Sequence, residues 1–328
     1  MAKKRKTSGQ LADELKRYIA PFRADGSGSF RLTSHRAGEK GGLDKDGAAE
    51  IIDANRTRLS GLQQRLYASD CWSLLLIFQG MDAAGKDSAI DHVFSGVNPQ
   101  GVDVASFKTP STLELNHDFL WRASQHLPQR GRLGIFNRSY YEECLIVRVH
   151  PEILASEKIP PRLVTKNIWR ERFEDINAYE RYLTRNGTVI LKFFLNVSWE
   201  EQRRRFLERL DDQTKNWKFS LADVSERKLW DKYQAAYQDM IAHTSTAVAP
   251  WHVVPSDHKW FGRVVIGSTI VAALERLDLR FPKVDKSKLA EFATARAALE
   301  LEGKQGKQRA VRSKAGVKTK RAAPKRPV

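Results

Sequence analysis

The feature that most constrains this chain is a short loop, with two glycines and a lysine, that joins an apolar segment to a helical one. The run LLLIF ends at Phe78, the pattern Gly80-x-x-x-x-Gly85-Lys86 follows, and a helix-forming segment begins directly after it. A phosphate-binding loop of the Walker A type requires this strand–loop–helix setting. Its glycines let backbone N–H groups turn inward, and the helix N-terminus and the lysine add positive charge. We therefore predict phosphate contacts, with an ordinary glycine turn as the alternative, from Gly80, Ala83, Ala84, Gly85, Lys86, Asp87 and Ser88.

Two acidic residues accompany this loop, and each needs a physical reason to lie near phosphate. Asp82 lies inside the loop, and Asp87 occupies the position where serine or threonine normally binds magnesium. Two like unit charges roughly 4 Å apart repel by about 4 kcal/mol at an effective dielectric of about 20, so a bare carboxylate opposes phosphate binding. A bridging Mg²⁺ reverses this sign, because it accepts both carboxylate and phosphate oxygens as ligands. We predict Asp82 as the metal ligand, with Mn²⁺ as an alternative ion, whereas the helix dipole explains Asp87 almost as well.

Short apolar segments alternate with amphipathic ones along the chain. The predicted strands are residues 72–78, 102–107, 133–136, 189–195 and 251–254. Ser111–Glu114 and Ser198–Glu201 have the S-x-x-E pattern that is typical of helix N-termini, and residues 45–68 have helical spacing. This alternation predicts an α/β fold with a doubly wound parallel sheet.

A further group of candidates follows the predicted strand at 133–136. Asn137 stands where ordinary phosphate-loop enzymes carry an aspartate that steadies magnesium. Arg138 lies just past the carboxyl end of the strand, where ligands bind in open α/β sheets. A guanidinium group there suits bidentate phosphate binding, and the alternative is a salt bridge to Glu142 or Glu143.

Basic residues recur at four-residue spacing in the C-terminal half, so that they share helix faces. The pairs are Arg205 with Arg209 and Lys259 with Arg263, and Lys215 and Lys218 follow the first pair in a loop. The first group stands where nucleotide kinases have a mobile lid. Acidic neighbours could neutralise it, so a solvated surface and an anion-binding wall both remain open (Glu201, Glu208, Asp211, Asp212).

The net charge of +17 is concentrated in the two ends of the chain. Residues 1–10 contribute +4 and residues 303–328 contribute +10, which leaves +3 for everything between them. A globally basic nucleic-acid-binding fold is therefore not required. We interpret the basic ends either as contacts for a polyanion or as solubilising tails.

Several classes of protein are excluded on composition. No apolar run reaches the roughly 18–20 residues that span a bilayer, and no apolar segment follows the basic N-terminus as in a secretory signal. Cys71 and Cys144 are too few for a disulfide framework or a cysteine-based zinc site. We predict a globular protein of the cytoplasm without membrane contact.

Motifs spread over residues 45–282 resemble the polyphosphate kinase family 2. They are GMDAAGKDS, FNRSYYEE, KFFLNVSWEEQRRRFLERLDDQTKNWKF, LWDKYQAAYQDMI, STAVAPWHVVP and the segment from Lys259 to Arg263. The resemblance implies a three-layer, thymidylate-kinase-like P-loop fold with a helical lid. It also implies Mg²⁺-dependent phosphoryl transfer between inorganic polyphosphate and AMP or ADP, with GMP and GDP as alternatives, in a homodimer or homotetramer.

The resemblance also assigns roles by position. It implies that Asp82, Lys86 and Arg138 are catalytic and that Asn137, Arg138 and Glu142 contact the nucleotide. The residues that it places on polyphosphate, besides the loop, are Lys108, Arg205, Arg209, Lys215, Lys218, Lys259 and Arg263. Asn137 replaces the acid of members restricted to diphosphate acceptors and resembles the subgroup that accepts mono- and diphosphates.

The expected organisation has four parts. They are a basic, extended segment at 1–44, a kinase domain at 45–282 with its lid around 200–222, a helix at 283–302 and a disordered basic tail at 303–328. Two other functions stay open: an ATP-dependent nucleoside monophosphate kinase, and a non-catalytic binder of polyanions or nucleic acid.

Overall fold

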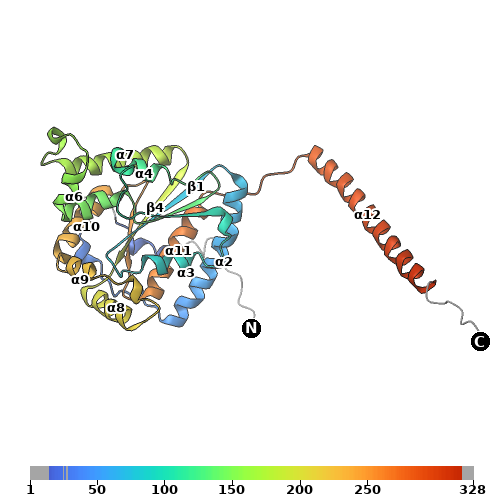
Figure 1. The fold of residues 1–328 in the computed structure, drawn as a ribbon, viewed down its shortest axis with the longest axis horizontal. Coiled ribbons are helices and arrows are strands. Elements are labelled where there is room, and N and C mark those ends of the chain that lie inside the picture. Colours follow the sequence, from blue (N-terminus) through green and yellow to red (C-terminus); the bar gives the residue numbers. More distant parts are fainter. Residues whose placement is uncertain (1–14, 25, 27–28, 320–328) are drawn as a thin grey trace, which may run out of the picture. The chain divides into compact units, whose positions relative to one another are not determined.

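The computed structural model describes residues 15–319 except 25, 27 and 28, without the side chains of Lys218 and of residues 306–319. Within these residues, five parallel strands form one sheet in the order β2-β3-β1-β4-β5 (Figure 1). The strands are β1 Ser73–Gln79, β2 Val102–Ser106, β3 Leu133–Asn137, β4 Thr188–Asn196 and β5 Trp251–Pro255. The predicted α/β fold is confirmed, and each predicted strand lies within two residues of an observed one.

Helices cover both faces of the sheet and make three layers. Figure 1 shows α2 (Lys45–Ser69), α3 (Lys86–Val93) and α11 (Lys259–Glu275) on one side, and α7 (Ile168–Arg185) and α10 (Trp230–Thr244) on the other. All seven residues of β1 are buried, as the apolar run predicts for a strand covered on both faces. Short helices and 3₁₀ turns make up most of the connections, among them α4 Trp121–Ser124, η5 Tyr140–Cys144, α5 Ile146–Val149 and α6 Pro151–Ser156.

The predicted lid lies between β4 and α10. It contains α8 (Trp199–Asp211), the 3₁₀ turn η7 (Asn216–Lys218) and α9 (Leu221–Arg227). Ser198 caps α8, because its hydroxyl accepts from the Glu201 N–H at 3.2 Å. Ser111 and Glu114 also exchange hydrogen bonds, but they open only the 3₁₀ turn η4 (Glu114–Asn116).

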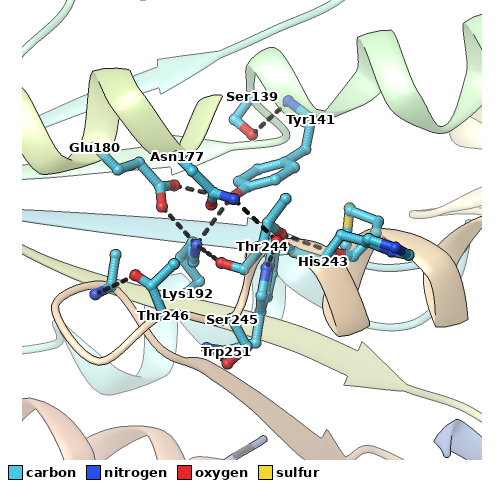
Figure 2. A network of polar contacts seen from close by, with 12 residues as sticks. Ser139, Tyr141, Asn177, Glu180, Lys192, His243, Thr244, Ser245, Thr246 and Trp251 are labelled. Carbon is cyan, nitrogen blue, oxygen red and sulfur yellow. Dashed lines mark hydrogen bonds and ion pairs between the residues drawn. The ribbon is translucent and has the colours of Figure 1, made fainter. Parts of the chain in front are cut away.

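A buried polar network fixes the segment that follows β3 (Figure 2). Lys192 of β4 donates to Glu180 of α7 at 2.6 Å, to the Tyr141 hydroxyl at 2.8 Å and to the Thr244 carbonyl at 2.7 Å. The hydroxyls of Tyr140 and Tyr141 donate to the other oxygen of Glu180 at 2.9 and 2.8 Å. Burial and the nearby carboxylate raise the pKa of both tyrosines well above the ordinary value, so both remain donors. The network therefore ties η5 to β4, α7 and α10.

Residues 281–328 form a second unit, separate from residues 1–280. Its helix α12 begins at Lys286 and continues to Thr319, where we predicted a disordered tail from residue 303. Good helix formers such as alanine, lysine, arginine and glutamine are frequent in this stretch, and no proline occurs between Lys286 and Thr319. Residues 1–14 and 320–328 lie outside the described part of the chain. No helix of the described residues is both long and apolar enough to cross a bilayer.

Candidate active site

The predicted phosphate loop connects β1 to α3, and its backbone adopts conformations that depend on glycine. Gly85, which precedes the first residue of α3, has φ 101°, in the left-handed region. A side chain at Gly80 would place its Cβ 2.9 Å from the Leu195 carbonyl oxygen, so only glycine fits there. Ala83 has φ 59°, a strained value for a residue with a side chain, and such strain is often found at functional sites.

Side chains donate hydrogen bonds to the carbonyl groups of the loop. Lys86 Nζ donates to the Gly80 carbonyl at 2.6 Å and to the Met81 carbonyl at 3.2 Å. From α8, Gln202 donates to the Asp82 carbonyl at 3.0 Å, and Arg205 donates to the Ala83 and Ala84 carbonyls at 2.9 Å each. Buried backbone carbonyls need such partners.

The amide groups of the loop are left available. Within the described part of the chain, the N–H groups of Asp82, Ala83 and Gly85 have no acceptor. Because side chains occupy the carbonyl groups, these N–H groups and the start of α3 remain available to an anion. Burial lowers the pKa of Lys86, and Asp82 opposes that shift.

Arg205 is one of the residues that we placed on polyphosphate, and the structure uses its guanidinium group differently. Besides the two loop carbonyls, it donates to Glu201 at 2.7 Å and to the carbonyls of Ser256 and Asp257. Its side chain is only 5% exposed, and each of its N–H groups has an acceptor within the protein. Arg205 therefore supports the loop from α8 and has no donor left for a substrate.

Arg138 and Asp82 meet at the carboxyl edge of the sheet. Arg138 NH2 donates to Asp82 Oδ1 at 2.9 Å, and both side chains are partly exposed. Arg138 has φ 65°, and its N–H donates to the Phe78 carbonyl at 3.0 Å, so the turn after β3 is anchored on β1. Burial would lower the pKa of Arg138, but Glu142 and Asp82 raise it by more, so the guanidinium stays charged. The alternative pairing with Glu142 or Glu143 is not the one seen.

Asn137 contacts one of the residues that we predicted for the phosphate loop. Its Nδ2 donates to Asp87 Oδ1 at 2.7 Å. This hydrogen bond joins the end of β3 to the first turn of α3. Two predicted site residues, Asn137 and Asp87, are therefore hydrogen-bonded to each other.

The lid cations Arg209 and Lys215 are paired with carboxylates. Arg209 lies 3.5 Å from Asp223, and Lys215 pairs with Asp212. Hydrogen bonds from Lys215 and Thr214 lower the pKa of Asp212 to about 2. The side chain of Lys218 lies outside the described part of the chain. Of the two interpretations of the lid, a surface neutralised by acidic neighbours therefore fits Arg209 and Lys215 better than an anion-binding wall of free cations.

A large cavity opens beside Arg138 and Glu142, and most of the residues that line it were not predicted from the sequence. It measures about 580 Å³, within the range of small-molecule sites. Its lining is mostly apolar and includes Phe107, Phe119, Ile146, Val147, Ile159 and Pro160. Lys108 lies on the same wall. A smaller cavity next to it is lined by Asp82, Arg138, Glu142 and Asp223, so the large cavity leads to the Asp82–Arg138 pair.

On the other side of the loop, Lys259 and Arg263 lie beside Gly85 and Ser88. Arg263 NH2 donates to Ser88 Oγ at 3.1 Å. The hollow between them measures only about 20 Å³, far too small for a nucleoside. A nucleoside-sized space is therefore found on the Arg138 side of the loop and not at this hollow.

The comparisons with known proteins agree with this geometry. The chain matches the family described as Polyphosphate kinase 2 (PPK2) over residues 42–282. The chain belongs to the polyphosphate kinase 2 family. It is 50% identical over 251 residues to the ADP-polyphosphate phosphotransferase of Rhodopseudomonas palustris, which covers 76% of this chain and 87% of that protein.

Another relative and a solved structure support the assignment. The chain is 42% identical over 264 residues to the AMP/ADP-polyphosphate phosphotransferase of Meiothermus ruber, which covers 80% of this chain and 95% of that protein. The crystal structure of polyphosphate kinase 2 from Arthrobacter aurescens has a TM-score of 0.77 and 38% sequence identity, and the match covers 84% of this chain and 95% of that one. This member of the polyphosphate kinase 2 family is therefore a phosphotransferase, and the resemblance seen in the sequence is confirmed.

The donor set for a metal ion in this polyphosphate kinase 2 site is small. Among the described residues, no group of three or more histidine, cysteine, aspartate or glutamate side chains could enclose an ion. Mg²⁺ in phosphoryl-transfer sites commonly uses one or two carboxylates and completes its shell with water and substrate phosphates. The single loop carboxylate of Asp82 fits that mode, in which the substrate supplies the other oxygens.

Proposed function

We propose that this protein transfers phosphoryl groups between inorganic polyphosphate and the adenine nucleotides ADP and AMP. The names of the two relatives, an ADP- and an AMP/ADP-polyphosphate phosphotransferase, support this choice of substrates. One structural observation carries the proposal. The Asp82–Arg138 pair lies between the phosphate loop and the large cavity, and the opposite side of the loop has a hollow but no nucleoside-sized space.

In the proposed arrangement, the acceptor nucleoside occupies the large cavity and its terminal phosphate reaches Arg138. The donor chain lies on the loop, where amide groups and Lys86 bind its terminal phosphates. Phosphoryl transfer requires little covalent chemistry from the protein, because most of the catalysis is in-line positioning and neutralisation of charge. Arg138 and Lys86 supply positive charge on the two sides of the transferred group, and Asn137 and Glu142 border the acceptor.

A divalent cation completes this charge balance. Kinases generally use one, and we propose Mg²⁺, with Mn²⁺ as an alternative, held by Asp82 together with phosphate oxygens. When bound, the ion neutralises charge on the phosphate oxygens. Acceptance of both mono- and diphosphates, use of GMP or GDP, a cytoplasmic location and a dimer or tetramer stay predictions.

The donor decides between the proposed reaction and its nearest alternative. Purified protein is incubated with Mg²⁺ and ADP, with long-chain polyphosphate as the sole donor, and ATP is measured against a control without polyphosphate. We expect ATP well above the level that ADP disproportionation produces. If polyphosphate yields no ATP but the protein phosphorylates AMP with ATP, it is instead an ATP-dependent nucleoside monophosphate kinase.

Removal of residues 303–328 tests whether the protein is instead a non-catalytic binder of polyanions or nucleic acid. We expect the shortened chain to retain its transfer activity, because every residue of the proposed site lies in unit 1–280. Loss of all measurable function with the tail would favour a non-catalytic polyanion binder, whose affinity falls steeply with salt.

A further inference from the structure

A strip of basic side chains from α11, α3 and α2 continues from the phosphate loop. We define this basic strip as Lys259, Arg263, Arg56 and His92. Lys259, the first residue of α11, is exposed, and its ammonium group has no partner among the residues that the structure describes. Arg263 follows one turn later and contacts Ser88 in the first turns of α3. The strip therefore starts directly beside the loop.

The far end of the basic strip was not among the predicted site residues. Arg56 of α2 approaches His92 of α3, with 3.5 Å between Arg56 NH2 and His92 Nε2. His92 lies four residues, or about 6 Å of helix, beyond Ser88 and on the same side of α3. Burial lowers the pKa of His92, and Arg263 and Arg56 lower it further. Arg56 therefore lies beside this imidazole, and the charge of Arg263 acts on it from α11.

Positive charge at this end is only partly compensated. Asp53 accepts from Arg56 NH1 at 3.1 Å, and Asp91 acts electrostatically on Arg263 and His92. The Nε–H groups of Arg56 and Arg263 are nevertheless buried without an acceptor among the described residues. An unsatisfied buried donor costs about 1–3 kcal/mol, and more when the group is charged. A bound anion would lower this cost by supplying a counter-charge near both guanidinium groups.

We propose that Arg56, His92 and Arg263 form a subsite for those phosphate groups of a linear donor that extend beyond the phosphate loop. This inference rests on the proposed function, since it gives a place to the rest of a polyphosphate chain. A phosphate loop holds about three phosphate groups, so a longer chain must continue along an adjacent surface. A row of cations suits a linear polyanion, whereas an ATP donor would need room for a ribose and a base.

Among the side chains that the structure describes, the lid offers fewer free cations for that chain. Arg205 is used by the protein itself, and Arg209 and Lys215 are paired with Asp223 and Asp212. The basic strip instead begins with the unpaired Lys259 and ends at two arginines with unsatisfied donors. The geometry therefore favours α3 and α11 over the lid as the direction in which the donor leaves the loop.

Substitution of Arg56 tests the subsite, and the same helix offers a matched control. Arg58 lies two residues further along α2 and pairs with Glu275. Binding of long-chain polyphosphate and of tripolyphosphate to the full-length Arg56→Gln, Arg56→Lys and Arg58→Gln proteins is measured directly, without nucleotide, at several salt concentrations. Thermal unfolding of each protein shows whether the fold is intact.

We expect Arg56→Gln to weaken long-chain binding about tenfold, the effect of one charge-assisted contact. The slope of log affinity against log salt should fall by about one, as expected when one phosphate contact is lost. Tripolyphosphate binding should change less than about twofold, because a chain of three phosphates ends at the loop. Arg56→Lys should recover part of the affinity, and Arg58→Gln should match the unsubstituted protein.

Unchanged long-chain binding in Arg56→Gln, or an equal loss for both donors, would overturn the subsite. The binding measurement also separates this inference from the proposed function. If the unsubstituted protein makes no ATP from polyphosphate but the chain-length effect of Arg56→Gln persists, the anion subsite stands and the proposed reaction fails. If ATP is made and Arg56→Gln binds both donors normally, only the subsite fails.

Discussion

Arg138 and Asp82 come from two different strand ends, and the guanidinium group of one donates to the carboxylate of the other at 2.9 Å. They meet because β1 and β3 are neighbouring parallel strands, with Phe78 opposite Asn137, so that both chains leave the sheet at the same edge. From the sequence we attributed the tolerance of a carboxylate in this loop to a metal ion alone. The structure adds a second counter-charge, which the protein itself supplies before any substrate binds.

Substitution of Asp82 by asparagine should abolish transfer without unfolding the protein. The change removes the only carboxylate inside the loop, and thereby the charge that would hold a cation against the phosphates. We expect kcat to fall at least about 100-fold, the scale of losing one transition-state charge contact. The melting temperature should hardly change, because a partly exposed ion pair contributes about 1 kcal/mol or less.

A similar ion pair elsewhere on the surface provides the control for Asp82. Asp103 pairs with Arg132 at 3.0 Å, and Asp103→Asn breaks the same kind of contact on β2. This variant should retain full activity. Substantial turnover by Asp82→Asn at saturating Mg²⁺ would show that the loop carboxylate has no part in the reaction.

Arg205 should act by positioning the phosphate loop, because its N–H groups are all engaged within the protein. Arg205→Met would leave the Ala83 and Ala84 carbonyls without their donor. We expect kcat to fall by about 10- to 100-fold, the cost of misplacing reacting groups, while the KM for polyphosphate changes little. Gln202→Leu, which removes the donor to the Asp82 carbonyl and no charge, should show the same pattern more weakly.

The neighbouring Arg204 separates positioning from simple loss of charge. It is exposed on α8 and pairs with Glu201 and Glu208. Arg204→Met should leave kcat within about twofold of the unsubstituted enzyme, because surface ion pairs contribute little. A rise in the KM for polyphosphate with unchanged kcat in Arg205→Met would instead show direct contact with the donor.

Breaking the buried ion pair of Lys192 and Glu180 should destabilise the protein strongly, because the remaining charge would stay buried without its partner. Glu180→Gln leaves the Lys192 charge without its carboxylate, and we expect a loss of about 3–5 kcal/mol in the free energy of unfolding in urea. Glu174→Gln is the control on the same helix, where an exposed pair with Arg170 should contribute less than about 1 kcal/mol. Equal effects of the two substitutions would contradict this assignment.

The buried His252 should make the protein less stable in mild acid. Burial lowers the pKa of His252 from 6.5 to about 3, so the folded protein keeps this imidazole neutral while the unfolded chain binds a proton below pH 6.5. Stability from this residue is therefore complete above pH 6.5 and is lost as the pH falls toward 3. At pH 5 we expect a loss of about 2 kcal/mol relative to pH 7.

Comparison with a variant isolates the contribution of His252 from that of other titrating groups. The free energies of unfolding in urea of the unsubstituted protein and of His252→Gln are measured at pH 5 and pH 7. The pH-dependent loss should be smaller in the variant by about 2 kcal/mol. Identical pH dependence of the two proteins would mean that His252 does not titrate in this way.

The fold could be predicted because its determinants are local. The apolar run that ends at Phe78 and the glycines after it specify a buried strand and a phosphate loop within a few neighbouring residues. The end of β3 could be predicted for the same reason, which is why Asn137 and Arg138 were found. Helical spacing, by contrast, showed that Arg205 and Arg209 share a face of α8, but not that Arg205 faces the loop carbonyls.

Parts of the site that depend on tertiary contacts could not be predicted. The walls of the large cavity come from segments such as 107–119 and 146–160, whose helices and 3₁₀ turns are too short to show a periodic pattern. Arg56 looked like any other charge on a helix, because its neighbours His92 and Arg263 are distant in sequence. The same holds for Lys192, a lysine inside an apolar strand whose partners come from α7, η5 and the end of α10.

The most direct test of the account is the rate at which Lys86→Ala makes ATP from ADP and long-chain polyphosphate, beside the unsubstituted enzyme. Lys86 is the loop cation whose amine is buried against the Gly80 and Met81 carbonyls, and in the proposed reaction it supplies the charge for the terminal phosphates of the donor. We predict at least a 100-fold lower rate, on the order of one lost electrostatic contact, in a protein that still unfolds cooperatively. Near-normal ATP formation by Lys86→Ala would contradict the claim that this loop is where the phosphoryl group is transferred.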